Sequence, residues 1–397
     1  MLTVVAVSLV ISALAACTTD NGSNGHQPPP RDGGAADPGP GGILITASGE
    51  VLALGGYGFP PADGATSFVD GWEVRFARVL VTIDKVTFSE NPDRAPGDQS
   101  QTEGIVAEVL GPWAVDLHAG GPLAGKGGGD ERAIALASVT SQNKTGGAPF
   151  DPTKRYAFGF DLVQATSSAT MVNLDADAAA DYADMVQNGY VVLYVGTATF
   201  KGGTSCTSPT TSYDFSKLPS VVSFRFGFKS PTSYVNCQNP DNDPAKPFDG
   251  EEHERGVQVK ANESVIAQVT VHTDHPFWES VVHDSPAHFD PIAARLVGAG
   301  VDAGTATVRL EDLVGVDFSS FKDGAGVPLP WRSCVPTYTA KAGTMGFDAQ
   351  SVPVNPGAPP DQALRDYRDF MTYDQSTQGH LNADGLCFVK RNYASPR

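Results

Sequence analysis

The sequence predicts a mainly β protein, an antiparallel β-sandwich with a few short helices and long loops, stapled by disulfides. Beyond residue 42, most segments alternate apolar and polar residues in twos or run through β-branched and aromatic residues. Gly, Pro and Asn punctuate these segments, as they do at the turns between antiparallel strands. An even number of cysteines is left for disulfides once one N-terminal cysteine is set aside.

Nine segments have the composition of strands, and we expect them at 43–54, 72–88, 105–117, 132–139, 155–163, 190–200, 220–228, 256–272 and 305–310. The second segment changes phase near Ala77 and Arg78, which predicts a bulge there. Segment 190–200 is apolar on both faces over its first half, which is typical of a central strand. Segment 220–228 alternates cleanly, which predicts a half-exposed strand.

Three helices are expected between these strands. Asp175 is a suitable N-cap for a helix over 176–187 that ends at Gly189. Asp290 and Pro291 open a second helix that ends near Gly298, and a third covers 361–371. These short helices decorate the sandwich and do not change its class.

The N-terminus has the pattern of a bacterial lipoprotein signal. Residues 1–16 form a short apolar run with small residues at its end, and Leu14-Ala15-Ala16-Cys17 matches the lipobox, so Cys17 is the expected lipid anchor. Residues 17–42 are polar and rich in Gly and Pro, which predicts a disordered tether. We therefore expect a lipid-anchored outer-membrane protein that faces the periplasm or the cell surface. Its domain covers 43–397, with a candidate C-terminal extension from about 285.

Charge and motifs exclude several classes of function. The net charge is −18, with 45 acidic and 27 basic residues, which repels nucleic acid. Residues 120–127, GGPLAGKG, approach a phosphate-binding loop, but Gly127 stands where a Ser or Thr would bind magnesium. Neither nucleic acid nor a nucleotide is expected as a partner.

Four cysteines are available for disulfides in an oxidising compartment: Cys206, Cys237, Cys334 and Cys387. Three pairings are open, and we expect the one between sequence neighbours, Cys206 with Cys237 and Cys334 with Cys387. Four thiolates around one metal ion are a weaker alternative, because no two of these cysteines are close in sequence.

A group of histidines is the one feature that points to chemistry. Four of the eight histidines, His272, His275, His283 and His288, lie between residues 272 and 288. Residues 265, 267, 269 and 271 are apolar, which places His272 and Asp274 on the opposite face of the preceding strand. Pro276 ends that strand, so His275 lies at its exit and can turn toward His272.

Imidazole and carboxylate ligands suit a transition metal such as copper or zinc. The expected primary ligands are His272 and His275, and the shell is completed by Asp274, His283, His288 or His380. His380 is a long-range candidate because the nearby Cys387 pins its loop to the body of the domain. His118 is a weaker candidate for a long-range ligand. The competing interpretation is a surface loop that is rich in His and Asp and held by ordinary hydrogen bonds.

Several segments resemble those of uncharacterised envelope lipoproteins of myxobacterial type: Asp70 to Asp93, Asn188 to Phe200, Ala267 to Ser280 and Ser376 to Cys387. Similar proteins carry a His-x-Asp-His-x-Phe stretch, which reads His272 to Phe277 in this chain. The resemblance implies a lipoprotein and draws attention to the histidine segment. It implies no reaction.

Three functions remain open from the sequence. The first is a cell-envelope protein that binds copper or zinc through the His/Asp cluster. The second is a non-catalytic adhesion or scaffold module that binds an envelope protein or a glycan, with Trp278, Trp331 and Tyr367 as candidate exposed aromatics. The third is a metal-dependent hydrolase, which ranks last because no catalytic signature accompanies the histidines.

Overall fold

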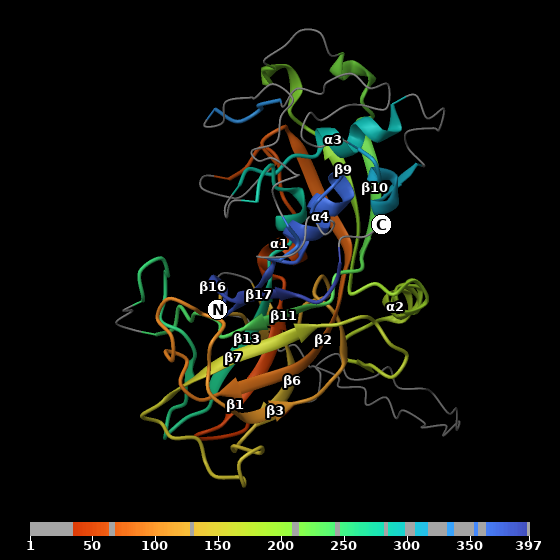
Figure 1. Cartoon of the computed structure of the whole chain (residues 1–397). Helices are drawn as coiled ribbons and strands as arrows, with labels where there is room; N and C mark the ends of the chain where they lie inside the picture. The colour runs from red at the N-terminus through yellow and green to blue at the C-terminus, as the bar shows by residue number, and fades with distance from the viewer. Residues whose placement is uncertain are drawn as a thin grey trace, which may run out of the picture.

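The computed structural model describes residues 35–62, 68–127, 131–208, 214–242, 247–281, 285–297, 306–316, 332–336, 353–355 and 363–394. The expected signal peptide, Cys17 and most of the tether lie outside these residues, as do His283 and Trp331. Strands dominate the described part, which confirms the mainly β class (Figure 1). Two sheets contain all of the strands of the described residues.

The smaller sheet has six strands and carries the histidines. Its order is β16 (Gly385–Leu386), β15 (Gly379–Leu381), β13 (Val265–Val271), β1 (Ile43–Ser48), β6 (Arg132–Val139) and β5 (Leu123–Ala124). β1 and β13 run parallel although Ser48 and Val265 are 217 positions apart in the sequence, so this sheet is mixed. Parallel neighbours need long crossover connections, which here contain much of the larger sheet.

The larger sheet is built around β2 (Trp72–Ser89), which runs through much of the length of the molecule (Figure 1). Its main path is β14 (Thr307–Arg309), β10 (Val221–Phe228), β9 (Val192–Phe200), β2, β7 (Arg155–Leu162), β11 (Thr232–Val235) and β17 (Phe388–Arg391). Four further strands join it at its sides: β3 (Ile105–Val109), β4 (Trp113–Asp116), β8 (Thr170–Met171) and β12 (Val257–Gln258).

Three detailed expectations for this sheet are confirmed. β9 lies between β2 and β10, so it is a central strand. The pairing of β2 with β9 shifts register between Phe76 and Arg78, which is the expected bulge. In β10, Val222, Phe224 and the later aromatic residues are buried whereas Ser223 and Arg225 are partly exposed.

Three expected strands are shorter than the sequence suggested. The first ends at Ser48, because the chain turns at Gly49 and enters a helix at Glu50. The segment 105–117 is split into β3 and β4 around Pro112, which has no backbone N–H for the ladder. The segment 256–272 contains two strands with a turn between Lys260 and Glu263.

The helices are short, as expected. They are α1 (Glu50–Gly55), α2 (Ala176–Asn188), α3 (Asp290–Ala293) and α4 (Tyr367–Gln375), with 3₁₀ turns η1 (Gly203–Ser205), η2 (Phe215–Lys217), η3 (His275–Phe277), η4 (Ala294–Leu296) and η5 (Leu310–Leu313). Asp175 accepts a hydrogen bond from the Ala178 amide and Gly189 is left-handed, so both predicted caps of α2 are confirmed. α4 begins later than expected.

One hydrophobic core joins the two sheets. Apolar residues of β1 and β13, such as Ile45 and Val269, belong to the same buried cluster as Val81 and Phe224 of the larger sheet. Burial of each such side chain contributes about 1.5 to 3 kcal/mol to folding. The opposite face of the smaller sheet is polar, and it carries the candidate site.

The predicted disulfide pairing is wrong. Cys206 is bonded to Cys334 and Cys237 to Cys387, with sequence separations of 128 and 150 residues. The reason is strand topology. β11 pairs with β17, which brings Cys237 beside Cys387, and a bridge between Thr207 and Ser333 does the same for the other pair. Cysteines that are adjacent in sequence order do not pair, because the fold places them in different parts of the structure.

Among the described residues, no helix is both long and apolar enough to cross a membrane.

Candidate metal centre

Two paired strands of the smaller sheet bring His272 and His380 together. β13 and β15 are antiparallel, with Thr270 opposite His380, and the His272 amide donates a hydrogen bond to the Gln378 carbonyl at 3.0 Å. Paired residues of antiparallel strands point to the same face, so His272 and His380 are diagonal neighbours on one face. Their rings stack with centroids 4.2 Å apart.

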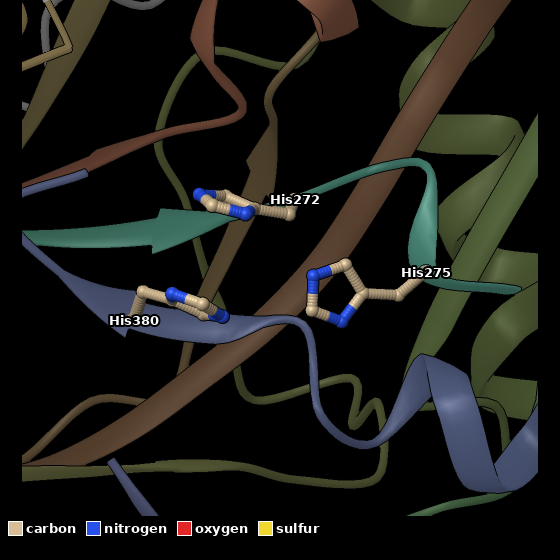
Figure 2. Close-up of side chains that lie close together, drawn as sticks. All are labelled: His272, His275 and His380. Carbon is tan, nitrogen blue, oxygen red and sulfur yellow. The ribbon is translucent and has the colours of Figure 1, made fainter. Parts of the chain in front are cut away.

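His275 reaches the same place from η3, the 3₁₀ turn that follows β13. Its ring centroid lies 5.5 Å from the centroid of His272 and 5.5 Å from that of His380. One ring nitrogen of each of the three histidines lies within 4.8 Å of the other two. Figure 2 shows the edge of the His275 ring directed toward the space beside the two stacked rings. The three imidazoles therefore share one focus.

The hydrogen bonds of His275 identify which of its nitrogens faces this focus. Nδ1 lies 2.7 Å from Oγ1 of Thr377, and that hydroxyl donates its proton to the Asp374 carbonyl at 2.7 Å. A threonine hydroxyl has one proton, so its oxygen accepts a hydrogen bond from Nδ1–H. Nε2 of His275 therefore carries the lone pair. A metal-binding histidine is commonly oriented in this way, by a hydrogen bond from its other nitrogen.

The site lies on a polar face that is nevertheless buried. Thr46, Ser48, Gln268 and Thr270 lie on this face and are at most 1% exposed. The sequence correctly placed His272 opposite the apolar residues of β13, but this face is covered by other parts of the protein. His275 and His380 are each 1% exposed, and His272 is only partly exposed.

Two carboxylates complete the surroundings of His272 on its other side. Glu50, His272 and Asp384 form a second group whose ligand atoms lie within 4.8 Å of one another. Oε1 of Glu50 is 3.6 Å from Nε2 of His272. Asp384 is exposed and follows β15, in the turn that leads to β16. The cluster as a whole thus combines three imidazoles with carboxylates.

These carboxylates favour a positive charge on His272. Burial by itself lowers the pKa of His272, but the hydrogen bond and the charge of Glu50 act in the opposite direction. Asp274 and Asp384 add to the effect, and the pKa of His272 rises to about 9. The environment is one that stabilises a cation, whether that cation is a proton or a metal ion.

Asp274 belongs to neither of the two groups. It is partly buried, and its Oδ2 accepts a hydrogen bond of 3.1 Å from the Trp278 indole. Burial raises the pKa of the Asp274 carboxyl, against the lowering effect of His272. Trp278 in turn stacks on the His275 ring with centroids 3.8 Å apart. Asp274 therefore supports the site through Trp278 and through charge.

His288 is held elsewhere, in a buried ionic network. Its Nε2 lies 3.0 Å from Oε2 of Glu279 and its Nδ1 lies 3.8 Å from Oδ2 of Asp70. Asp70 also accepts hydrogen bonds from the amides of Phe289 and Asp290 at 2.7 Å. His288 is thus a structural residue at the start of α3, and the expectation that it joins His272 is not met. The predicted ligand His283 lies outside the described residues.

Sequence reasoning missed Glu50, Thr377 and Asp384. Glu50 is the clearest case, because the parallel pairing of β1 with β13 ends with Ser48 opposite Thr270, and the turn that follows β1 brings Glu50 to His272. Nothing in the sequence signals a parallel pairing between segments so far apart. The one available signal was the turn at Gly49, which ends β1 just before a carboxylate.

Comparison with protein-family models, with curated proteins and with solved structures found no match for this chain.

A buried carboxylate on α4 leads to a prediction about stability. Burial raises the pKa of Asp374 well above its usual range, against the lowering effect of Arg391. Oδ2 of Asp374 has no hydrogen-bond partner among the described residues. Because the folded-state pKa is raised, the folded protein binds a proton more tightly than the unfolded chain does. The stability associated with this proton is complete below about pH 4 and is lost as the pH rises toward the folded-state pKa.

Asp374→Asn is therefore expected to stabilise the protein more at pH 7.5 than at pH 4.5, because asparagine never has to be buried as an anion. Urea unfolding of both proteins at the two pH values measures this difference. An equal effect at both pH values would show that burial does not raise the pKa of Asp374.

Proposed function

We propose that this protein is a lipid-anchored cell-envelope protein that binds a transition-metal ion, zinc or copper(II), through His272, His275 and His380. The observation that carries the proposal is the convergence of the three imidazoles on one focus. Histidines scattered at random over a protein do not meet in this way, and three imidazoles brought together from two segments far apart in the sequence are a ligand set of known zinc and copper sites.

The geometry requires a small adjustment to hold an ion. Zinc lies about 2.0 to 2.1 Å from each imidazole nitrogen, so its ligand atoms are about 3.4 Å apart in a tetrahedron. The three nitrogens now lie within 4.8 Å of one another. Rotation of the stacked His272 and His380 rings brings them closer, while the Thr377 hydrogen bond holds His275 in place.

The alternative of an adhesion module receives less support. Its candidate aromatic residues Trp278 and Tyr367 are buried, with exposed fractions of 4% and 1%. Trp278 packs on His275 and Tyr367 lies on α4, next to Phe370. Both therefore serve the interior of the protein and leave no exposed aromatic surface at these two positions.

Titration of the purified full-length protein tests the proposed function. The protein is stripped with a chelator, dialysed and titrated with Zn²⁺ and separately with Cu²⁺ in competition with a chromophoric chelator. We expect at least one tightly bound equivalent of either ion at pH 7.5. If neither ion binds at a stoichiometric level, the proposed function is wrong. A separate experiment tests the lipid anchor. We expect the wild-type protein to incorporate a lipid label, and we expect Cys17→Ser to abolish that labelling.

Thr377→Val is expected to weaken metal binding. Valine has nearly the shape of threonine but cannot accept the proton of His275 Nδ1, so the ring loses the hydrogen bond that fixes its orientation. Changes of this kind cost about 10- to 100-fold in metal affinity. The matched control is Thr372→Val, because Thr372 is a buried threonine on α4, just before Thr377, and among the described residues its hydroxyl bonds the Arg368 carbonyl. An equal loss in both variants would contradict the role of Thr377.

A further inference from the structure

We infer that the protein has a second cation position, formed by Glu50, Asp384 and the second ring nitrogen of His272, so that His272 bridges two metal ions. The inference rests on the proposed function, because the first ion is the one held by the three imidazoles. It adds a second divalent ion of the same class, zinc or copper(II), at a distinct set of ligand atoms.

The two nitrogens of His272 face different groups. Nε2 is the atom that lies 3.6 Å from Oε1 of Glu50. In Figure 2 one nitrogen of His272 is on the side of His275 and the other is turned away from it. Since Nε2 is directed toward Glu50, Nδ1 is the nitrogen that faces the three-imidazole focus. A single ring can therefore offer one nitrogen to each position.

The backbone holds Glu50 in this position. The parallel pairing of β1 with β13 ends at the Ser48–Thr270 pair, and the turn into α1 then places Glu50 next to His272. Its amide donates a hydrogen bond to Oγ of Ser48 at 2.9 Å, and its backbone is left-handed, with φ of 56°. Non-glycine residues rarely adopt this conformation, and it persists where the surrounding structure fixes it.

Charge favours a cation at this position. No Lys or Arg of the described residues forms an ion pair with Glu50 or Asp384, and His272 is the basic side chain that lies close to both. Asp384 is exposed, which gives an ion access from solvent, whereas His275 and His380 are buried. Two carboxylates and one imidazole form a ligand set that suits zinc.

Binding of the second ion releases one proton from His272. With the first ion on Nδ1, the neutral ring of His272 keeps its proton on Nε2. The second ion forms a bond to Nε2 and that proton leaves to solvent, so the ring becomes an imidazolate. One proton is released for each second ion bound, and no oxidant or reductant takes part.

Titration of the full-length protein with Zn²⁺ alone tests the inference. The wild type is expected to bind two equivalents. The double variant Glu50→Gln, Asp384→Asn keeps the size of both side chains and is expected to bind one. The matched control is Asp249→Asn, Glu252→Gln, which makes the same change of charge at two exposed residues outside both groups and is expected to bind two. Circular dichroism verifies that each variant is folded.

Electron paramagnetic resonance of the wild type with Cu²⁺ tests the bridge without any substitution. The signal is expected to grow up to one equivalent and then to fall toward the second, because an imidazolate bridge couples the two spins. A signal that doubles at two equivalents would contradict the bridge. If the wild type binds one equivalent, this inference fails and the proposed function stands, whereas binding of none refutes both.

Discussion

Replacing His272 and His275 together by alanine is expected to reduce the affinity for Zn²⁺ and Cu²⁺ by at least about 100-fold. A loss of this size is the upper end of that caused by mutating residues that hydrogen-bond to metal ligands, so removal of two ligands should cost at least as much. The double variant keeps one of the three imidazoles and removes the ring that is common to both candidate groups. Neither ion should remain bound after dialysis, and the competition titration measures the loss directly.

The matched control is His253→Ala, the same chemical change at a histidine outside both groups. It is expected to leave the affinity unchanged. A similar fall in both proteins would mean that the histidines bind metal without forming a site. Unchanged binding by the double variant would place the metal elsewhere in the protein.

Removing the disulfide between Cys237 and Cys387, by changing both to serine, is expected to have the largest effect on stability. The bond closes a loop of 150 residues. The chain-entropy estimate gives about 5 kcal/mol for a loop of this length, and measured losses for native disulfides are about 2 to 5 kcal/mol. Urea unfolding under non-reducing conditions measures the change in the free energy of unfolding.

The same variant should also weaken metal binding. Cys387 immediately follows β16, which pairs with β15, the strand that carries His380. The matched control is Cys206→Ser, Cys334→Ser, which opens a loop of 128 residues but is tied to neither strand of the site. It is expected to lose a similar amount of stability while it keeps its metal affinity in the folded state. If both variants lost the same metal affinity, the disulfide between Cys237 and Cys387 would have no specific role in holding the metal site.

The sequence predicted those features that depend on neighbouring residues. Alternating residues located most of the strands, and Asp175 and Gly189 set the ends of α2 as their chemistry requires. The alternation in β13 also gave the direction of His272 correctly. Each of these inferences needs only a window of about ten residues.

The remaining features depend on which strands are neighbours, and local patterns do not determine that. The parallel pairing of β1 with β13 brings Glu50 to His272, and the pairing of β11 with β17 decides the disulfide of Cys237. His288 was misassigned for a related reason. Its nearness in sequence to His275 says nothing of the carboxylates of Asp70 and Glu279, between which the fold places it.

X-ray absorption spectroscopy of the protein with one equivalent of Zn²⁺ tests the central claim most directly. The ion should have three imidazole nitrogens at about 2.0 Å, and His380→Ala should lower that number to two. A shell of oxygen atoms alone, or an imidazole count that does not change when His380 is removed, would contradict a metal centre formed by His272, His275 and His380.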